Sequence, residues 1–162
     1  MDMTWAEICE DKLLAKLPYR IETDRWGHIV MSPPPRSRHA EYQGAILALL
    51  RDLMEGGRAL PEVPVQTSEG VKAIDAVWVS EQRRKSRPND PCYLIAPEIC
   101  VEVESPSNSD DEMTERKRLY FEKGADEFWL CDLNGDMTFF DPAGEIPKSK
   151  LCPKFPLKVV VD

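Results

Sequence analysis

The sequence predicts a single α/β domain over residues 1–162, with a mixed β-sheet flanked by helices. Short segments of alternating or continuous apolar residues are typical of strands, and two longer segments have helical apolar spacing. Strands are expected at 19–22, 28–31, 62–67, 72–80, 98–104, 127–132, 137–141 and 157–161, and the main helices at 37–54 and 110–123. A length of 162 residues suits one domain with a sizeable core.

The first third of the chain is expected to form a helix and a hairpin. Thr4 can cap a helix that continues to about Leu17. The two strands that follow are joined by residues 23–27, whose composition indicates a hairpin turn. Residues 32–35 include three prolines, which predict a stiff, extended connector.

The two main helices carry recognisable boundaries. The helix at 37–54 has apolar residues at helical spacing and ends before the Gly-Gly pair at 56–57. The second helix begins with a capping box formed by Ser109 and Glu112 and ends at Gly124.

Carboxylates line one face of the strand at 98–104. Glu98, Glu102 and Glu104 alternate with apolar residues, so their side chains point to the same side. Neighbouring carboxylates repel one another and resist burial, and a divalent cation would relieve both effects. The alternative is an edge strand with a solvated acidic face.

A further carboxylate, Asp75, lies between apolar neighbours inside the strand at 72–80. Asp is depleted from strands, so its presence there needs a reason. It can end a ladder, satisfy a nearby turn, or lie beside Glu102 on the next strand. Two carboxylates on adjacent strands can hold Mg²⁺, which prefers oxygen ligands.

Two basic residues, Arg116 and Lys117, flank the apolar face of the second helix, which Met113, Tyr120 and Phe121 are expected to form. In an isolated helix such side chains cover apolar surface and keep their charges in water. Beside a carboxylate pair, a cation could instead help a metal to stabilise phosphate charge.

These features together resemble the PD-(D/E)xK nuclease superfamily, in which an Asp in one strand precedes an acidic strand and a helix that carries a lysine. More closely, the chain resembles the small bacterial Uma-type restriction-endonuclease proteins. The segments that carry the resemblance are IDAV at 74–77, APEICVEVESPSN at 96–108, EM at 112–113 and LYFEKGADEFWLCD at 119–132, with 31–35 and His39 upstream. The similarity covers nearly the whole chain.

The resemblance implies a restriction-endonuclease-like fold and metal-dependent hydrolysis of phosphodiester bonds in nucleic acid, with DNA as the expected substrate. Asp75 and Glu102 would bind Mg²⁺ or Mn²⁺, with the Val103 carbonyl as a further ligand. A cation on the following helix, Lys117 or Arg116, would orient water or stabilise the transition state.

Two departures from the family pattern bear on the catalytic cation. Glu104 occupies the position, two residues after Glu102, where the superfamily has lysine. In the resembled family this lysine is moved four residues before the tyrosine of the next helix, which is Arg116 here. Arg cannot give up a proton, so it could bind phosphate but could not act as a general base. If a proton must move, the chemistry favours Lys117, and we expect Lys117 to serve.

The start of the helix at 37–54 offers two further candidates. Glu41 is expected chiefly to complement the positive end of the helix dipole. For His39, contact with substrate and a purely structural role are equal alternatives.

The net charge of −8 opposes generic attraction to nucleic acid, but metal-binding carboxylates contribute to it, so a nuclease is not excluded. The densest basic run, RRKSR at 83–87, could grip a nucleic-acid backbone or could simply be solvated.

The sequence shows no membrane-spanning apolar run and no signal-peptide pattern, so we expect a cytoplasmic protein without a membrane partner. Its five cysteines are scattered without a C-x-x-C pair, which predicts reduced thiols and no zinc site.

Two functions are therefore weighed. The first is a Mg²⁺-dependent endonuclease, expected to act as a homodimer because two-fold symmetry suits cleavage of two strands. The second is a non-catalytic DNA-binding or protein-interaction module that kept the fold and lost the lysine.

Overall fold

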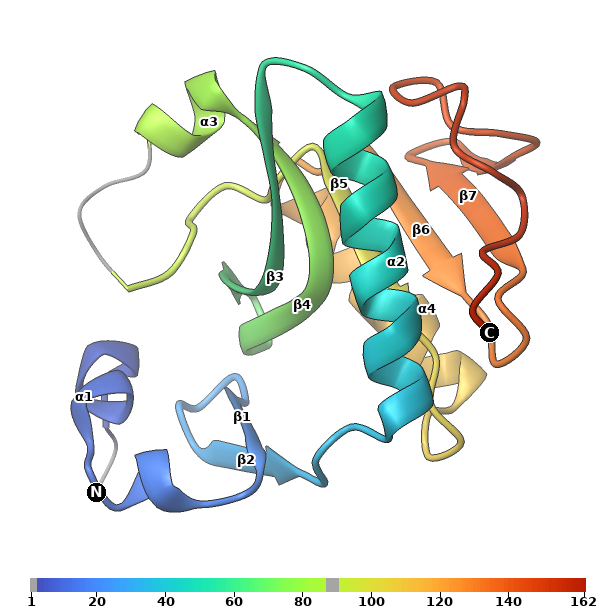
Figure 1. Cartoon of the computed structure of the whole chain (residues 1–162). Coiled ribbons are helices and arrows are strands. Elements are labelled where there is room, and N and C mark those ends of the chain that lie inside the picture. The colour runs from blue at the N-terminus through green and yellow to red at the C-terminus, as the bar shows by residue number, and fades with distance from the viewer. Residues whose placement is uncertain (1–2, 87–90) are drawn as a thin grey trace.

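A computed structural model describes residues 3–86 and 91–162 and contains a six-stranded mixed sheet, ordered β3-β4-β5-β6-β7-β8, and a separate β1-β2 hairpin (Figure 1). The strands are β1 (Arg20–Thr23), β2 (Ile29–Ser32), β3 (Gly57–Thr67), β4 (Gly70–Ser80), β5 (Ile99–Val103), β6 (Glu127–Cys131), β7 (Met137–Asp141) and β8 (Gly144–Ile146). The helices are α1 (Trp5–Glu10), the 3-10 helix η1 (Leu14–Lys16), α2 (Ser37–Leu53), α3 (Glu81–Ser86) and α4 (Asp110–Glu122). The predicted α/β class with a mixed, helix-flanked sheet is confirmed.

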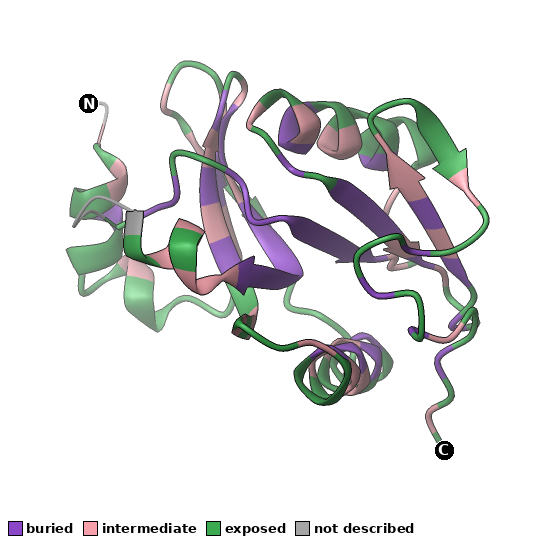
Figure 2. Cartoon of the chain, turned by 90° about the horizontal axis from the view of Figure 1, so that it is seen from above, coloured by how far each residue is buried: buried purple, intermediate pink, exposed green. Residues whose placement is uncertain are grey.

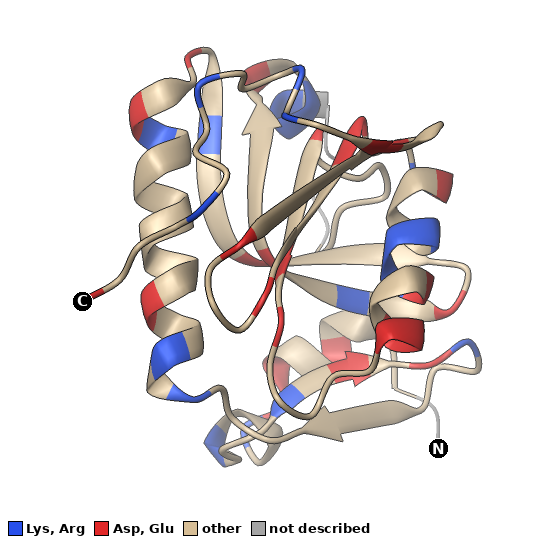
Figure 3. Ribbon diagram, turned by 90° about the vertical axis from the view of Figure 1, so that its right-hand side faces the viewer, with Lys and Arg blue, Asp and Glu red and all other residues tan. Residues whose placement is uncertain are grey.

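The six-stranded sheet lies between two helices, with α2 on one face and α4 on the other (Figure 3). Successive residues of β5 enter opposite cores, because side chains alternate across a strand. Ile99 and Val101 pack with α2, whereas Cys100 packs with α4. Because α2 and α4 cover the two faces of the sheet, β5 is buried along its whole length (Figure 2). Among the residues that the structure describes, no helix is long and apolar enough to span a membrane.

The connection from β5 to β6 determines where the predicted site lies. These two strands are adjacent and parallel, with α4 as their crossover, while the other neighbouring strands of the sheet are antiparallel. The end of β5 therefore leads directly into the loop before α4. Glu102 and Val103 occupy this end of the strand.

The β1-β2 hairpin packs against the first half of β4, which precedes the residues that pair with β5. Side chains of β1 accept hydrogen bonds there: the backbone N–H of Val71 donates to Thr23 Oγ1 at 2.9 Å, and that of Ala73 to Glu22 Oε2 at 2.7 Å. The close contact between β1 and the start of β4 requires glycine at position 70, because φ there is +96° and a Cβ atom would lie 2.3 Å from the Thr23 carbonyl oxygen. Hairpin and sheet thus meet closely.

The helices α2 and α4 match their predicted bounds to within a residue or two, but the N-terminal helix is shorter than predicted. It ends at Glu10 because the Asp11 side chain accepts the backbone N–H groups of Leu13 and Leu14, which starts a separate turn.

Two strand predictions need correction. β3 begins at Gly57 rather than near residue 62, because Pro61 and Pro64 are tolerated on a strand at the edge of the sheet. Segment 157–161 is not a strand: its backbone forms an isolated bridge from Lys158 to Asp136, and Val159 packs into the core.

Candidate active site

Asp75 and Glu102 face one another on adjacent strands. The β4–β5 register pairs Ala76 with Val101, and extending it by one step places Asp75 opposite Glu102 on the same side of the sheet. The two residues are only 1% and 2% exposed. The predicted juxtaposition of the two carboxylates is thus present.

Three donors hold the carboxylate of Asp75. Arg20 Nη1 donates to Oδ1 at 3.1 Å, the Val103 N–H donates to Oδ2 at 2.8 Å, and His39 Nε2 lies 3.2 Å from Oδ2. Burial alone would raise the pKa of Asp75, but the His39 hydrogen bond and the charge of Arg20 outweigh it and lower this pKa. The Asp75 side chain is therefore ionised.

Glu102 lies in a different environment. Tyr120 donates its hydroxyl to Glu102 Oε1 at 2.5 Å, and Arg116 Nη1 lies 3.6 Å from the same oxygen. Burial and the neighbouring charge of Asp75 raise the pKa of Glu102 well above its ordinary value, with Arg116 and Arg20 opposing this. The two carboxyl groups of the site therefore have pKa values shifted in opposite directions.

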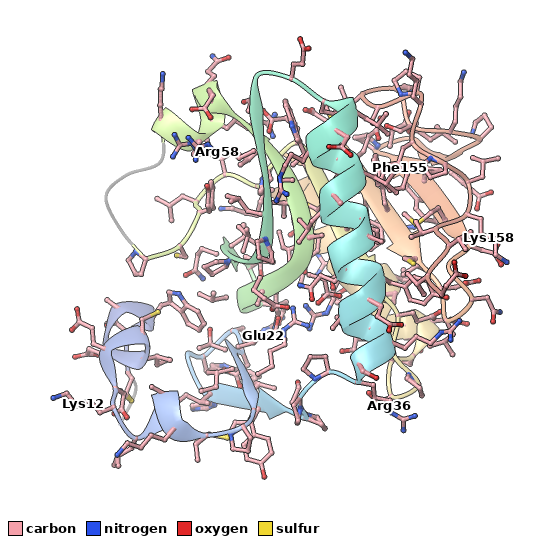
Figure 4. The ribbon with its side chains drawn as sticks, viewed as in Figure 1. Lys12, Glu22, Arg36, Arg58, Phe155 and Lys158 are labelled. Carbon is pink, nitrogen blue, oxygen red and sulfur yellow. The ribbon has the colours of Figure 1, made fainter. Side chains whose placement is uncertain are left out.

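Arg116 is paired mainly with a residue that the sequence analysis did not select, Glu22 of β1. The guanidinium donates to both carboxylate oxygens, at 2.9 and 2.7 Å, in the planar arrangement typical of strong Arg–carboxylate pairs. Burial would raise the pKa of Glu22, but Arg116 outweighs it and lowers this pKa. Figure 4 shows Glu22 where the hairpin meets the lower end of the sheet.

Lys117 does not lie at this site, contrary to our expectation. Its ammonium group lies 4.1 Å from the ring centroid of Phe140, and it borders a small separate hollow with Leu130 and Phe128. Arg116 and Lys117 are about 100° apart around the helix axis, so only one of them can face the carboxylates. The structure places Arg116 there.

A strained residue lies directly opposite Asp75 on the other neighbouring strand. Glu62 of β3 has a φ of +49°, which is uncommon for a residue other than glycine. Gln43 of α2 donates to both the Asp75 backbone carbonyl, at 2.6 Å, and Glu62 Oε1, at 2.9 Å. The Gln43 side chain therefore takes the place of a backbone hydrogen bond between β3 and β4 at this position. Burial raises the pKa of Glu62.

Asp75, Glu102 and several of the residues around them line a cavity of about 770 Å³. The carboxylates, Val103, Arg116 and His39 form part of its lining, together with residues of the β1-β2 hairpin, the proline connector and the loop before α4. Glu41 does not line it and is exposed, whereas His39 contacts Asp75 directly. The hydrogen bond to Asp75 raises the pKa of His39.

Residues 83–85, the part of the basic run whose side chains the structure describes, do not line this cavity. They belong to α3, where Arg83 lies 3.2 Å from Glu98 and 3.3 Å from Asp126, and Arg84 pairs with an acid of the same helix. Arg83 thereby joins α3 to neighbouring loops instead of presenting a free charge. The last residue of the run, Arg87, lies outside the described residues.

The chemistry of the site suits a hard divalent cation. Asp75, Glu102 and the Val103 carbonyl offer only oxygen ligands, and Mg²⁺ commonly binds through one or two carboxylates while keeping several waters. Asp75 already accepts three hydrogen bonds, two at Oδ2 and one at Oδ1. Within residues 3–86 and 91–162, no three His, Cys, Asp or Glu side chains converge to hold a metal, so water or substrate would complete the shell.

Sequence analysis missed three charged or polar groups of the site: Arg20, Glu22 and Gln43. Arg20 and Glu22 alternate on one short predicted strand, so their shared face was a usable signal. Gln43 gave no signal, since its role depends on the backbone of another strand.

Comparisons with known proteins agree on the fold. A crystal structure described as a "putative nuclease belonging to DUF820" from Anabaena variabilis ATCC 29413 superposes with a TM-score of 0.72 at 20% identity, covering 90% of this chain and 92% of the other. No curated protein matches the chain. The family model Uma2, described as "putative restriction endonuclease", matches residues 11–141. These residues include the hairpin, both carboxylate strands and α4, so the chain belongs to the Uma2 family.

Proposed function

We propose that this protein is a metal-dependent endonuclease that hydrolyses phosphodiester bonds in nucleic acid, with DNA as the expected substrate. The observation that carries the proposal is the pair of opposed, buried carboxylates, Asp75 and Glu102, lining the cavity beside Arg116. Membership of a family described as restriction endonucleases supports the same reaction class.

Asp75, Glu102 and the Val103 carbonyl would hold Mg²⁺ or Mn²⁺. When bound, the ion would supply Lewis-acid stabilisation of phosphate charge and lower the pKa of coordinated water. His39 and Arg20 fix the orientation of Asp75 through its two oxygens. The Tyr120 hydroxyl holds Glu102 Oε1 in the same way.

Arg116 has a distinct role in this proposal. It is positively charged at all relevant pH values, so it can offset charge on a phosphate but cannot accept the proton of water. Burial opposes its charge, but Glu102 and Glu22 more than compensate and raise the pKa of Arg116. We therefore assign phosphate stabilisation to Arg116 and no role in the reaction to Lys117.

A nicking assay tests the proposal. Supercoiled plasmid and single-stranded circular DNA are incubated with the protein and Mg²⁺, Mn²⁺ or EDTA. We expect cleavage with either metal and none with EDTA, and loss of cleavage in Asp75→Asn. Glu41→Gln, an exposed acid near the site, should retain activity. Absence of cleavage with both metals, in protein shown to be folded, would contradict the proposal.

The second candidate is a non-catalytic nucleic-acid-binding or protein-interaction module. Its supporting observation is Arg116, whose charge is already paired with Glu22. Binding of nucleic acid without cleavage, and without any change on adding Mg²⁺, would favour this candidate.

The homodimer and the cytoplasmic location stay predictions; sedimentation at micromolar concentration tests the former.

A further inference from the structure

One wall of the cavity is apolar and differs from the floor that holds the carboxylates. It consists of the segment before β1, one residue of β2 and the proline connector: Pro18, Tyr19, Met31, Pro33, Pro34 and Pro35. Tyr19 and Met31 are 48% and 45% exposed, an unusual degree of exposure for such large side chains. The wall thus offers a ring and flat apolar surface within the same cavity as Asp75.

The charges around the mouth of the cavity are uneven. Arg36, at the start of α2, lines the cavity, is exposed and has no ion-pair partner among the described residues (Figure 4). The lining also contains acids that are not buried in its floor, namely Glu112 in the first turn of α4 and Glu62 of β3. A phosphate is therefore attracted to Arg36, at the positive end of α2, and repelled by the carboxylate of Glu112.

The floor of the cavity is deep. Asp75 and Glu102 are almost fully buried, and the volume of about 770 Å³ falls in the range of pockets that enclose a small molecule. An intact duplex keeps its bases stacked inside, so it has no free base face for Tyr19. An unpaired strand offers both base faces and a flexible backbone, which are the features that aromatic side chains and isolated cations bind.

From this arrangement we propose that the cavity binds an unpaired nucleic-acid strand, with a base stacked on Tyr19 and a phosphate near Arg36. The assignment of this strand as the substrate rests on the proposed nuclease function. The carboxylates then receive a phosphodiester that can bend into the cavity. Intact duplex binds less well because neither Tyr19 nor the cavity floor is reached.

Fluorescence anisotropy tests this binding mode. The probes are a labelled twelve-residue oligothymidylate and a labelled blunt twelve-base-pair duplex, measured with wild-type protein in EDTA so that no metal-dependent cleavage occurs. We expect the single strand to bind at least tenfold more tightly than the duplex. Equal or tighter binding of the duplex, or no binding of either probe, would overturn the proposal.

Aromatic variants supply the matched controls. Tyr19→Ala should weaken binding of the single strand about tenfold, whereas Tyr19→Phe, which keeps the ring, should bind as wild type does. Trp26→Ala should have no effect, because Trp26 belongs to the same hairpin and is 66% exposed but does not line the cavity. Equal losses in Tyr19→Ala and Trp26→Ala would also overturn the proposal.

The two proposals fail separately. If the protein prefers the single strand but cleaves no nucleic acid with Mg²⁺ or Mn²⁺, the nuclease function fails and the binding mode stands. If it cleaves duplex and single strand equally well and binds them equally, the nuclease function stands and the binding mode fails.

Discussion

At the scale of single residues, Asp75 and Glu102 are chemically alike but their surroundings differ. Asp75 accepts three hydrogen bonds, whereas Glu102 accepts one from the Tyr120 hydroxyl and is fully enclosed. Two carboxyl groups this close titrate as a pair, and a single proton on Glu102 removes their repulsion. A divalent cation would replace that proton.

Glu102→Gln should abolish Mg²⁺ binding without destabilising the folded protein. The amide keeps the shape of the protonated carboxyl and removes the need to bury an ionisable group, so we expect the unfolding free energy to stay the same or rise by about 1 kcal/mol. Calorimetry should show that Mg²⁺ binding is lost. Glu104→Gln, one residue beyond the end of β5, should change neither quantity. A variant that binds Mg²⁺ normally would refute the assignment of Glu102 as a ligand.

Mg²⁺ binding should release a proton. The pKa of Glu102 is raised, so the proton is bound below that raised pKa and must leave when a cation binds. The apparent affinity for Mg²⁺ should therefore increase as the pH rises toward the raised pKa of Glu102. Titration calorimetry in two buffers of different ionisation enthalpy measures the released proton, and identical heats in both buffers would contradict the expectation.

Lys117→Ala should leave metal-dependent cleavage within about twofold of wild type, since its ammonium group contacts Phe140 on the far side of the helix. Cleavage rates at saturating Mg²⁺ provide the measurement. A severe loss of rate in a normally folded variant would restore the role that sequence reasoning gave to Lys117.

At the scale of elements, the site depends on a hairpin that lies outside the main sheet. β1 brings Arg20 to Asp75, 55 positions away in sequence, and Glu22 to Arg116, 94 positions away. Both helices were predictable because caps, glycines and apolar spacing are local signals. Helical spacing did not decide between Arg116 and Lys117, since Met113 and Tyr120 leave both on the flanks of the buried stripe. Arg116 faces the carboxylates because it pairs with Glu22, and this pairing is a tertiary contact that helical spacing cannot predict.

A double-mutant cycle should show that Glu22 and Arg116 stabilise the docked hairpin jointly. Either single change to Ala leaves a buried charge without its partner and should cost about 3–5 kcal/mol of unfolding free energy. The double variant should lose much less than the sum of the single losses, giving a coupling of several kcal/mol. Glu69→Ala, which breaks the exposed Arg25–Glu69 pair of the hairpin turn, should have a far smaller effect. Additive losses in denaturant titrations would contradict the coupling.

At the scale of the whole molecule, charge limits how the protein meets nucleic acid. The chain has a net charge of −8. In its densest basic run, Arg83 and Arg84 form ion pairs with acidic residues of the protein itself. Among the described residues, the arginines that line the cavity are Arg20, Arg36 and Arg116, and two of these are paired with buried acids. In the absence of metal, affinity must therefore come from few phosphate contacts together with stacking.

The affinity for single-stranded DNA should accordingly depend weakly on salt. With at most three phosphate contacts, the logarithm of the binding constant should fall against the logarithm of salt concentration with a slope of about −2 or shallower. Anisotropy titrations from 50 to 300 mM salt would measure this slope. A slope steeper than about −4 would indicate a long basic track that the cavity does not provide.

The separation between Glu22 and Arg116 also has a consequence for synthesis of the protein. The hairpin leaves the ribosome before α4, and its buried acid, Glu22, has no ion-pair partner until α4 is translated. At 5–20 residues per second, this interval of 94 residues lasts about 5–20 seconds. Throughout that time the nascent chain lacks a complete site, so a destructive activity would begin only when the last helix of the site is in place.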